Sequence, residues 1–339
     1  MMPLVSIITT TLDLIKSNRE YLFHKCVSSV LNQKYDNIEY IIQDGMSSDG
    51  TKEILEFYKN NKAVSIYYEK DSGIDNAYNR AVKHARGKYI YFLNSDDMIY
   101  DSNVISDAVD FLELHEADYV YGNAEVTDRD EKSLFVFRPR MENFWRDMPY
   151  SHQAFLVKRE VFLSLGGHTE EYGMGGDYDF AIKLILNDNK GVYLDRCIAY
   201  YRLGGVSGQD GVCHKLSCIY ILSAIMQKLY SQFYKNIDLD QCVKIYHFGE
   251  SNKEVYPALF LEKLVRFIVQ KNLKHYDTEN MIHYINNICN INYITCKERI
   301  FKYKIFGIIP ILKVKMYKNK TSYFLFNFIP LLKVKETHR

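Results

Sequence analysis

The sequence predicts an α/β protein with a Rossmann-like, mostly parallel sheet flanked by helices, followed by a helical extension and a short basic-apolar tail. Three observations support this fold class. Short apolar, β-branched runs alternate with segments of helical spacing over about the first hundred residues. Polar and acidic residues follow directly after these runs. Beyond about residue 211 the pattern changes to helical spacing, which continues as far as the tail. Strands that alternate with helices in this way are typical of parallel sheets with right-handed crossovers.

The first two predicted strands enclose one helix. Leu4–Thr10 is an apolar, β-branched run that ends in threonine hydroxyls. Apolar residues three and four positions apart predict a helix over Arg19–Asn32. The second strand, Glu39–Gln43, is followed by Asp44 and a glycine. Both strands therefore end in groups that can form hydrogen bonds with a ligand.

The next elements continue the alternation. Helices are expected over Thr51–Tyr58 and Asn76–Arg86, with a short strand at Ser65–Tyr68 between them. Tyr89–Asp97 is a near-continuous apolar run, typical of a buried parallel strand, and it stops in two adjacent carboxylates.

These strand ends are expected to meet. Open α/β sheets bind ligands beyond the carboxyl ends of their strands, so the polar groups that follow the strands should line one crevice. Asp96 and Asp97 would repel each other there, unless a hard divalent cation shared with substrate phosphates neutralises them. An ordinary solvated turn is the alternative for this pair.

Two common nucleotide-binding motifs are missing from the sequence. Neither G-x-G-x-x-G after the first strand nor G-x-x-x-x-G-K-[ST] occurs, which disfavours dinucleotide binding and P-loop hydrolysis. Phosphates are therefore expected to be held by a metal ion rather than by a glycine-rich loop.

Four segments carry a family resemblance: Pro3–Thr10, Ser28–Thr51, Asp71–Asp97 and Ser151–Ser207. In this order they resemble inverting family 2 glycosyltransferases with a GT-A fold, in particular the subgroup that builds bacterial O-antigen, capsule and exopolysaccharide. The resemblance implies transfer of a sugar from a nucleotide sugar, in the first instance a UDP-sugar, to a hydroxyl of a glycan or lipid-linked acceptor. It also implies dependence on Mg²⁺ or Mn²⁺.

The resemblance assigns donor-binding roles to the strand ends. Thr9, Thr10 and Asp44 would hold the nucleoside, with Asp44 accepting from the imide N–H of the base. Asp97 corresponds to the last carboxylate of the family's D-x-D-like motif and would bind the metal. Asp96 would lie beside it, near the ribose or the sugar. A plain Asp-Gly turn is the alternative for Asp44.

A further donor contact is implied at one predicted helix. Asn76, Asn79 and Arg80 share one helical face, which we expect to point into the crevice together with Asp75. Relatives commonly carry an aspartate at the position of Asn76, whereas here the acid stands one place earlier. Helix capping is the alternative role for Asp75.

The resemblance assigns the catalytic base to Asp177, at the start of an apolar helical run. Inverting transfer needs one carboxylate near the acceptor hydroxyl, opposite the leaving diphosphate. The alternative is a helix-start acid favoured by the macrodipole, which is the role we assign to Asp179. His152 could contact acceptor or diphosphate, or be structural. Arg202 could belong to a loop reaching Ser207 that closes over the diphosphate, or stabilise a turn.

Composition sets the expected compartment and partners. The 339 residues carry a formal net charge of +1, which gives no case for nucleic acid binding. The seven cysteines include no C-x-x-C pair, so free thiols in a reducing cytosol are expected. The apolar stretch at the start of the sequence is too short to be a membrane anchor. No apolar window reaches the roughly 18 residues that a membrane-spanning helix needs. We expect a cytoplasmic protein.

The C-terminal third divides into helices and a tail. We expect residues 1–211 to be the catalytic domain, 212–296 a helical extension and 297–339 the tail. Helical spacing covers Lys215–Tyr234, Tyr256–Lys274 and Thr278–Cys289. The tail repeats itself, since Ile305–Lys315 and Leu325–Lys335 are identical at seven of eleven positions. A proline in each copy predicts extended segments or turns.

The tail is also basic. It holds eleven Lys/Arg and two Asp/Glu, a net charge of +9, whereas residues 1–296 carry −8. Apolar residues among lysines suit an anionic membrane surface. We therefore expect the tail to hold the enzyme against the inner face of the cytoplasmic membrane, near a lipid-linked acceptor. The alternative is a strand pair folded on the helices, with its lysines in solvent.

Two other functions remain open from the sequence. A sugar-nucleotidyltransferase could share the sheet and the metal-binding acid, although a glycine-rich, Arg-containing loop after the first strand would then be expected. A non-catalytic scaffold could keep the fold without turnover, and Asn76 favours it. The acids Asp44, Asp97 and Asp177 favour an enzyme.

Overall fold

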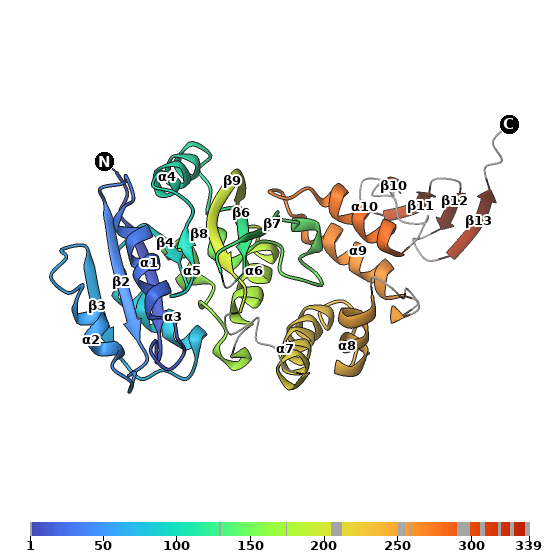
Figure 1. Cartoon of the computed structure of the whole chain (residues 1–339). Helices are drawn as coiled ribbons and strands as arrows, with labels where there is room; N and C mark the ends of the chain where they lie inside the picture. Colours follow the sequence, from blue (N-terminus) through green and yellow to red (C-terminus); the bar gives the residue numbers. More distant parts are fainter. Residues whose placement is uncertain are drawn as a thin grey trace.

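The computed structural model describes residues 2–128, 130–173, 175–204, 212–249, 252, 255–257 and 259–289, together with the backbone of four later strands. Side chains of residues 212–217, 286 and 288–289 and of the later strands lie outside this description. A central mixed sheet has helices on both faces, and a helical segment follows it along the molecule (Figure 1).

The first half of the sheet is parallel, as predicted. Its strands are β1 (Val5–Thr11), β2 (Ile38–Asp44), β3 (Val64–Tyr68) and β4 (Tyr89–Phe92), in the order β3-β2-β1-β4. The register sets Thr11 beside Asp44. The ends of the two predicted strands are therefore neighbours.

The second half is mixed and was not predicted strand by strand. β8 (Phe155–Lys158) runs antiparallel between β4 and β6 (Tyr119–Thr127), and β9 (Gly191–Arg202) runs parallel to β6. β5 (Met98–Ile99) pairs with β9, and β7 (Ser133–Phe137) pairs with β6.

Helices cover each face of the sheet. The three N-terminal predictions agree with the structure to within a few residues. Helix α3 begins two residues before the predicted start, directly after Gly73, whose φ of 141° favours glycine. One face carries α1 (Glu20–Leu31), α2 (Thr51–Glu56) and α4 (Val104–Leu114), and the other carries α3 (Ile74–His84), α5 (Arg159–Ser164) and α6 (Gly176–Leu186).

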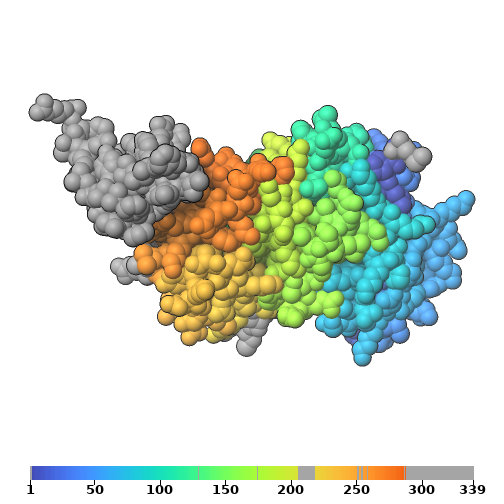
Figure 2. Space-filling view, turned by 180° about the vertical axis from the view of Figure 1, so that it is seen from behind, coloured from blue at the N-terminus to red at the C-terminus, as the bar shows by residue number. Residues whose placement is uncertain are grey.

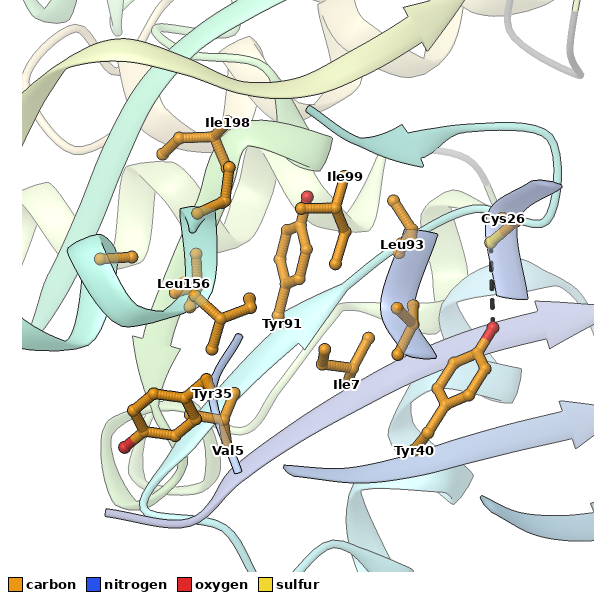
Figure 3. Close-up of a cluster of buried hydrophobic side chains, with 14 of the residues drawn as sticks. Val5, Ile7, Cys26, Tyr35, Tyr40, Tyr91, Leu93, Ile99, Leu156 and Ile198 are labelled. Atoms are coloured by element: carbon orange, nitrogen blue, oxygen red, sulfur yellow. Dashed lines mark hydrogen bonds between the residues drawn. The ribbon is translucent and has the colours of Figure 1, made fainter. Parts of the chain in front are cut away.

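Alternate residues of the parallel strands fill two separate cores. Ile7 and Tyr91 point into the core beneath α1 and α4, whereas Ile8 and Phe92 point into the core beneath α3 and α6. Figure 3 shows the first of these cores, where Cys26 of α1 contacts a tyrosine hydroxyl of β2. Burial on both faces explains why these strands read as continuous apolar runs.

The run Tyr89–Asp97 differs from the prediction in one respect. Strand β4 ends at Phe92, and the two acids follow after a turn closed by the Asp97 N–H donating to the Asn94 carbonyl at 3.1 Å. The acids therefore lie on the turn between β4 and β5, and not on the strand end itself.

The helical segment packs on α6. Its hydrophobic core includes Tyr178, Ile182 and Ile185 of α6, and Figure 2 shows it against the middle of the chain. One helix was missed by the sequence analysis, although Asp238 caps its start by accepting from the Gln241 N–H at 2.7 Å. The segment consists of α7 (Val212–Tyr230), α8 (Leu239–Phe248, the missed helix), α9 (Phe260–Lys271) and α10 (Thr278–Cys289).

Two sequence expectations concern thiols and membranes. In the described residues Cys26, Cys197, Cys218 and Cys242 are free, as expected. None of the helices that the structure describes combines the length and the apolar character needed to cross a bilayer.

The tail backbone is extended, in line with the prediction. Its strands pair antiparallel in chain order, and each repeat copy contributes one of them. The predicted membrane contact depends on side chains that lie outside the described residues. The strands are β10 (Arg299–Ile305), β11 (Ile309–Tyr317), β12 (Lys320–Leu325) and β13 (Ile329–Lys335).

Candidate functional site

A cavity of about 290 Å³ lies at the N-terminal end of α6. Three carboxylates and two imidazoles line it: Asp75, Asp147, Asp177, His152 and His168. The wall also contains aromatic rings, which come from α3, from the strands β7 and β9, and from the segment before β8. These are Tyr78, Phe135, Phe137, Tyr150 and Tyr201. Acid–base groups and flat apolar surfaces thus share one cavity.

Asp177, the predicted base, is the second residue of α6. Its Oδ2 lies 4.0 Å from Nδ1 of His152, and its Oδ1 accepts the N–H of Tyr178 at 2.7 Å. Burial, and then the nearby charge of Asp75, raise the pKa of Asp177 to about 6, whereas His168 opposes the shift. This carboxylate can therefore exchange a proton close to neutral pH.

His152 is a neutral neighbour of this carboxylate. Burial, reinforced by His168, lowers the pKa of His152 to about 3. Its ring stacks on Phe92 with centroids 5.7 Å apart and planes 15° apart. A neutral imidazole fixed in this way can donate or accept a hydrogen bond in the cavity.

Asp75 also reaches the cavity, but it does not cap its own helix. Gly73 is the N-cap of α3, and no side chain caps that end. The Oδ2 atom of Asp75 instead accepts the N–H of Gly176 at 3.1 Å, at the start of α6. The capping alternative from the sequence is therefore wrong for α3.

The predicted shared face of α3 points away from the cavity. Asn76 and Asn79 both donate to Glu170, at 2.8 and 2.9 Å. Arg80 donates to Glu69 and to Asn76. The expectation that this face points into the crevice is wrong, because these side chains bond to Glu170 in the loop before α6 and to Glu69 just after strand β3 instead.

Asp97 lies one layer behind the cavity wall. Its Oδ1 accepts the Arg202 N–H at 2.8 Å, and its Oδ2 accepts from the Asn94 amide at 3.1 Å. A further hydrogen bond joins it to Gln153, and both amide side chains line the cavity. Burial, and then the adjacent half-buried Asp96, raise the pKa of Asp97 well above its usual range.

This arrangement fits a divalent cation. Asp97 is 2 % exposed, so water cannot solvate its negative charge. A bound cation would compensate for this lost solvation. Within the described residues no three His, Cys, Asp or Glu side chains form a metal cluster. Mg²⁺ needs only one or two carboxylates, because water and substrate phosphates complete its coordination. Asp97 and Asp96 offer that donor set.

The hydroxyls at the end of β1 have different environments. Thr9 is fully buried, and its Oγ1 accepts from the Tyr40 hydroxyl at 3.0 Å. The expected donor contact of Thr9 is therefore wrong, since its side chain points into the core. Thr10 is half-buried and forms a hydrogen bond with Tyr78 in the cavity wall.

Asp44 lies at a second polar cluster, on the end of β2. Its carboxylate accepts from the Thr11 hydroxyl at 2.9 Å and from the hydroxyl and N–H of Ser47 at 2.6 and 2.8 Å. Asp71 lies close to Gly45, the residue after Asp44, since a Cβ added at Gly45 would lie 2.5 Å from Asp71 Oδ2. Asp44 is not among the described residues that line the cavity.

Arg202 supports Asp97 through its backbone. Its side chain pairs with Glu131 at 3.2 Å and is 8 % exposed. The predicted loop beyond it, with Gly205 and Ser207, lies outside the described residues. Asp179 pairs with Lys183 and Lys228 near the start of α6, at 2.8 and 3.2 Å, in keeping with a structural role.

Several site residues were missed by the sequence analysis. Asn94 and Gln153 connect Asp97 to the cavity, and each stands next to a residue or motif that was selected, in LNSDD and in SHQ. His168 follows a Gly-Gly pair inside the fourth resembling segment. Its position beside Asp75 depends on a contact between distant parts of the chain, which no local pattern signals.

Comparisons with known proteins point to one family. The family described as Glycosyl transferase family 2 matches residues 16–168. A PGL/p-HBAD biosynthesis glycosyltransferase of Mycobacterium bovis is 28% identical over 188 residues, which are 55% of this chain and 71% of that relative. The putative teichuronic acid biosynthesis glycosyltransferase TuaG of Bacillus subtilis is 40% identical over 97 residues, 28% of this chain and 36% of TuaG.

Solved structures share the fold. S. aureus TarS 1–349, in complex with UDP-GlcNAc, aligns with a TM-score of 0.55 at 17% identity and covers 84% of this chain and 88% of its own. The mannosyltransferase PcManGT from Pyrobaculum calidifontis, in complex with GDP-Man and Mn²⁺, aligns with a TM-score of 0.54 at 16% identity, covering 86% of this chain and 87% of its own.

Proposed function

Residues 16–168 are a glycosyl transferase family 2 domain within a GT-A fold, and from this premise we propose that this glycosyltransferase is inverting and metal-dependent. It would move a sugar from a nucleotide sugar to a hydroxyl of a glycan or lipid-linked acceptor. The observation that carries the proposal is Asp177, a cavity carboxylate whose pKa is raised to about 6 beside a neutral His152.

Asp177 is the proposed general base. Above about pH 6 its carboxylate is ionised and can take the proton of the acceptor hydroxyl as that oxygen bonds to the anomeric carbon. The bond from that carbon to the diphosphate breaks on the opposite face, which inverts the configuration. Neutral His152, within 4.0 Å, can orient the hydroxyl without competing for its proton.

The donor is proposed to be a UDP-sugar. TarS is described in complex with UDP-GlcNAc, and PcManGT with GDP-Man, so a nucleotide sugar suits this fold. Asp44 would accept the imide N–H of the base, with Thr10 and Asp71 nearby. The bonds that Asp44 already makes to Thr11 and Ser47 would hold its carboxylate in place for that contact.

Asp97, together with Asp96, would hold Mg²⁺ or Mn²⁺. When bound, the cation stabilises the negative charge that develops on the leaving diphosphate. PcManGT is described with Mn²⁺, which supports this assignment. Asn94 and Gln153 would keep Asp97 oriented toward the cavity through their hydrogen bonds.

The acceptor is proposed to belong to bacterial surface polysaccharide synthesis. TuaG is named for teichuronic acid biosynthesis, which favours a glycan or lipid-linked acceptor. Aromatic rings such as Phe137 and Tyr201 in the cavity wall offer flat apolar surfaces for a sugar ring. The basic tail would bring the enzyme to an anionic membrane surface that carries such acceptors.

The substitution Asp177→Asn tests the proposal. Thermal-shift screening with UDP-, dTDP- and GDP-sugars in the presence of Mn²⁺ first identifies the donor, because a bound ligand raises the unfolding temperature. We expect the variant to bind that donor with unchanged affinity, and to transfer sugar about 10²–10⁴-fold more slowly, the usual contribution of a general base.

Asp179→Asn is the matched control. It removes a carboxylate two positions away on the same helix and should retain most of the activity. Transfer by Asp177→Asn at the wild-type rate would contradict the proposal, and so would a product with the anomeric configuration of the donor.

A further inference from the structure

A second buried carboxylate stands behind the proposed base. Asp75 is 4 % exposed and lines the same cavity as Asp177. Its Oδ2 accepts the N–H of Gly176, the residue directly before Asp177, at 3.1 Å. Its Oδ1 lies 3.1 Å from Nδ1 of His168, which is 2 % exposed. The carboxylate thus joins α3, the loop before α6 and the first turn of α6.

The contact between Asp75 and α6 leaves no room for a side chain at Gly176. A Cβ added at Gly176 would lie 2.5 Å from Cγ of Asp75 and 2.6 Å from each of its carboxylate oxygens. The carboxylate therefore packs directly on the backbone of Gly176. Only glycine allows this approach, so the position of Asp75 and the start of α6 depend on each other.

His168 is held as firmly as Asp75. Its backbone N–H donates to Asn79 Oδ1 at 3.0 Å, and the Asn79 amide donates to its carbonyl at 2.8 Å. Its ring is surrounded by other rings with centroids between 5.2 and 5.9 Å away. These are Tyr78, Phe92, His152, Phe162 and Phe180. The ring therefore has little freedom to turn its Nδ1 away from Asp75.

We propose that Asp75 and His168 form a positioning pair, which holds the first turn of α6 and controls the ionisation of Asp177. The inference rests on the proposed role of Asp177 as the base. Neither member of the pair touches the reacting atoms; both act through Asp177.

The two members act on Asp177 in opposite directions. After burial, the charge of Asp75 raises the pKa of Asp177, and His168 lowers it. The other titratable groups around the cavity come from different elements and remain in place when the pair is changed. They are Tyr78, Asp147, Tyr150, His152 and Tyr201. Removing Asp75 or His168 should therefore shift the titration of Asp177 to opposite sides of the wild-type midpoint.

The test is an NMR titration of the full chain labelled with ¹³C at the aspartate carboxyl carbons. The signal that disappears in Asp177→Asn identifies Asp177. We expect a wild-type midpoint near 6. In Asp75→Asn, which keeps an oxygen to accept the Gly176 N–H, the midpoint should fall by about one pH unit, and in His168→Gln it should rise.

Control variants distinguish a failure of the Asp75–His168 pair from a failure of the proposed role of Asp177 as the base. Asp179→Asn removes another carboxylate of α6 and should leave the Asp177 midpoint unchanged. If Asp75→Asn leaves the titration midpoint of Asp177 unchanged or raises it, the proposed pair is wrong. This outcome does not depend on what the enzyme transfers, because the titration needs no substrate. If Asp75→Asn does not fold, as judged by thermal unfolding, the direction of the shift in His168→Gln decides. Wild-type transfer by Asp177→Asn would instead refute the proposed function.

Discussion

Asp97 is a buried acid and Asp177 a half-buried one, and their surroundings suit different tasks. Asp97 is enclosed by N–H donors and lies next to another acid, so a bound cation would stabilise its anionic form. Asp177 faces a cavity with a neutral imidazole at 4.0 Å, so its carboxylate can accept a proton. Two residues of one type thus differ in chemistry because their neighbours differ.

At the residue scale we predict that Asp97→Asn abolishes metal-dependent binding of UDP. The amide can keep the hydrogen bond from the Arg202 N–H, but it loses the charge that holds the cation. Isothermal titration calorimetry with UDP, in the presence and absence of Mn²⁺, measures the effect. Wild-type affinity should fall when Mn²⁺ is removed with EDTA.

The control for this substitution is Asp118→Asn, which removes a half-buried acid that pairs with Lys158 at 2.9 Å, away from the cavity. It should bind UDP and Mn²⁺ as the wild type does. If Asp97→Asn also binds them unchanged, the metal is held elsewhere.

At the element scale, the loop between α5 and α6 depends on two successive glycines. Gly166 and Gly167 both have left-handed backbones, with φ of 81° and 65°. A Cβ at Gly167 would lie 2.6 Å from Asn79 Oδ1, whereas a Cβ at Gly166 would have no atom within 4 Å. An alanine at Gly166 would therefore introduce backbone strain alone, whereas an alanine at Gly167 would add a clash with Asn79 of α3.

We predict that Gly166→Ala lowers the free energy of unfolding by about 1 kcal/mol, the usual cost of a left-handed alanine. Gly167→Ala should cost about 2–3 kcal/mol, because it also displaces the Asn79 side chain that holds His168. Urea unfolding measures both values. Equal losses would show that the contact with Asn79 contributes little to stability.

Much of the N-terminal half could be predicted at this scale. The strands β1, β2 and β4 are buried on both faces, so their apolar runs were evident. Farther along the chain, α10 has the predicted bounds, Thr278–Cys289. The shared face of Asn76, Asn79 and Arg80 was correctly identified, but its direction was not. That direction is set by Glu170, more than ninety residues later in the chain, and local spacing carries no such information.

The candidate site shows the same limit. Asp177 and His152 were selected by resemblance, and the structure brings them together. Thr9 was misassigned because strand alternation alone does not tell which face a helix covers. His168 was missed because its partner Asp75 lies on another element. Chemistry carried by a motif could be predicted, whereas chemistry created by tertiary contact could not.

At the scale of the whole molecule, charge is divided between the tail and the rest. With +9 on residues 297–339 and −8 before them, the chain should bind vesicles that contain phosphatidylglycerol. Replacing the four repeat lysines by glutamine should weaken this binding at least tenfold, since each basic residue contributes about 1 kcal/mol before screening. Vesicle co-sedimentation measures it. The lysines are Lys313, Lys315, Lys333 and Lys335.

The matched control replaces four exposed lysines of the N-terminal half. It changes the net charge equally and should leave vesicle binding unchanged. Equal weakening by both sets, or unchanged binding in the tail variant, would contradict a membrane role for the tail. The control lysines are Lys52, Lys59, Lys62 and Lys70.

Helix α6 belongs to two hydrophobic cores at once. Phe180 and Leu184 pack beneath the sheet, while Tyr178, Ile182 and Ile185 pack among α7 to α10. Removing the helical segment would expose those three side chains. Each of them contributes about 1.5–3 kcal/mol to the free energy of unfolding when it is buried. The segment α7 to α10 therefore supports helix α6, and a shortened chain that omits it would lose the support for the carboxylate that we propose as the base.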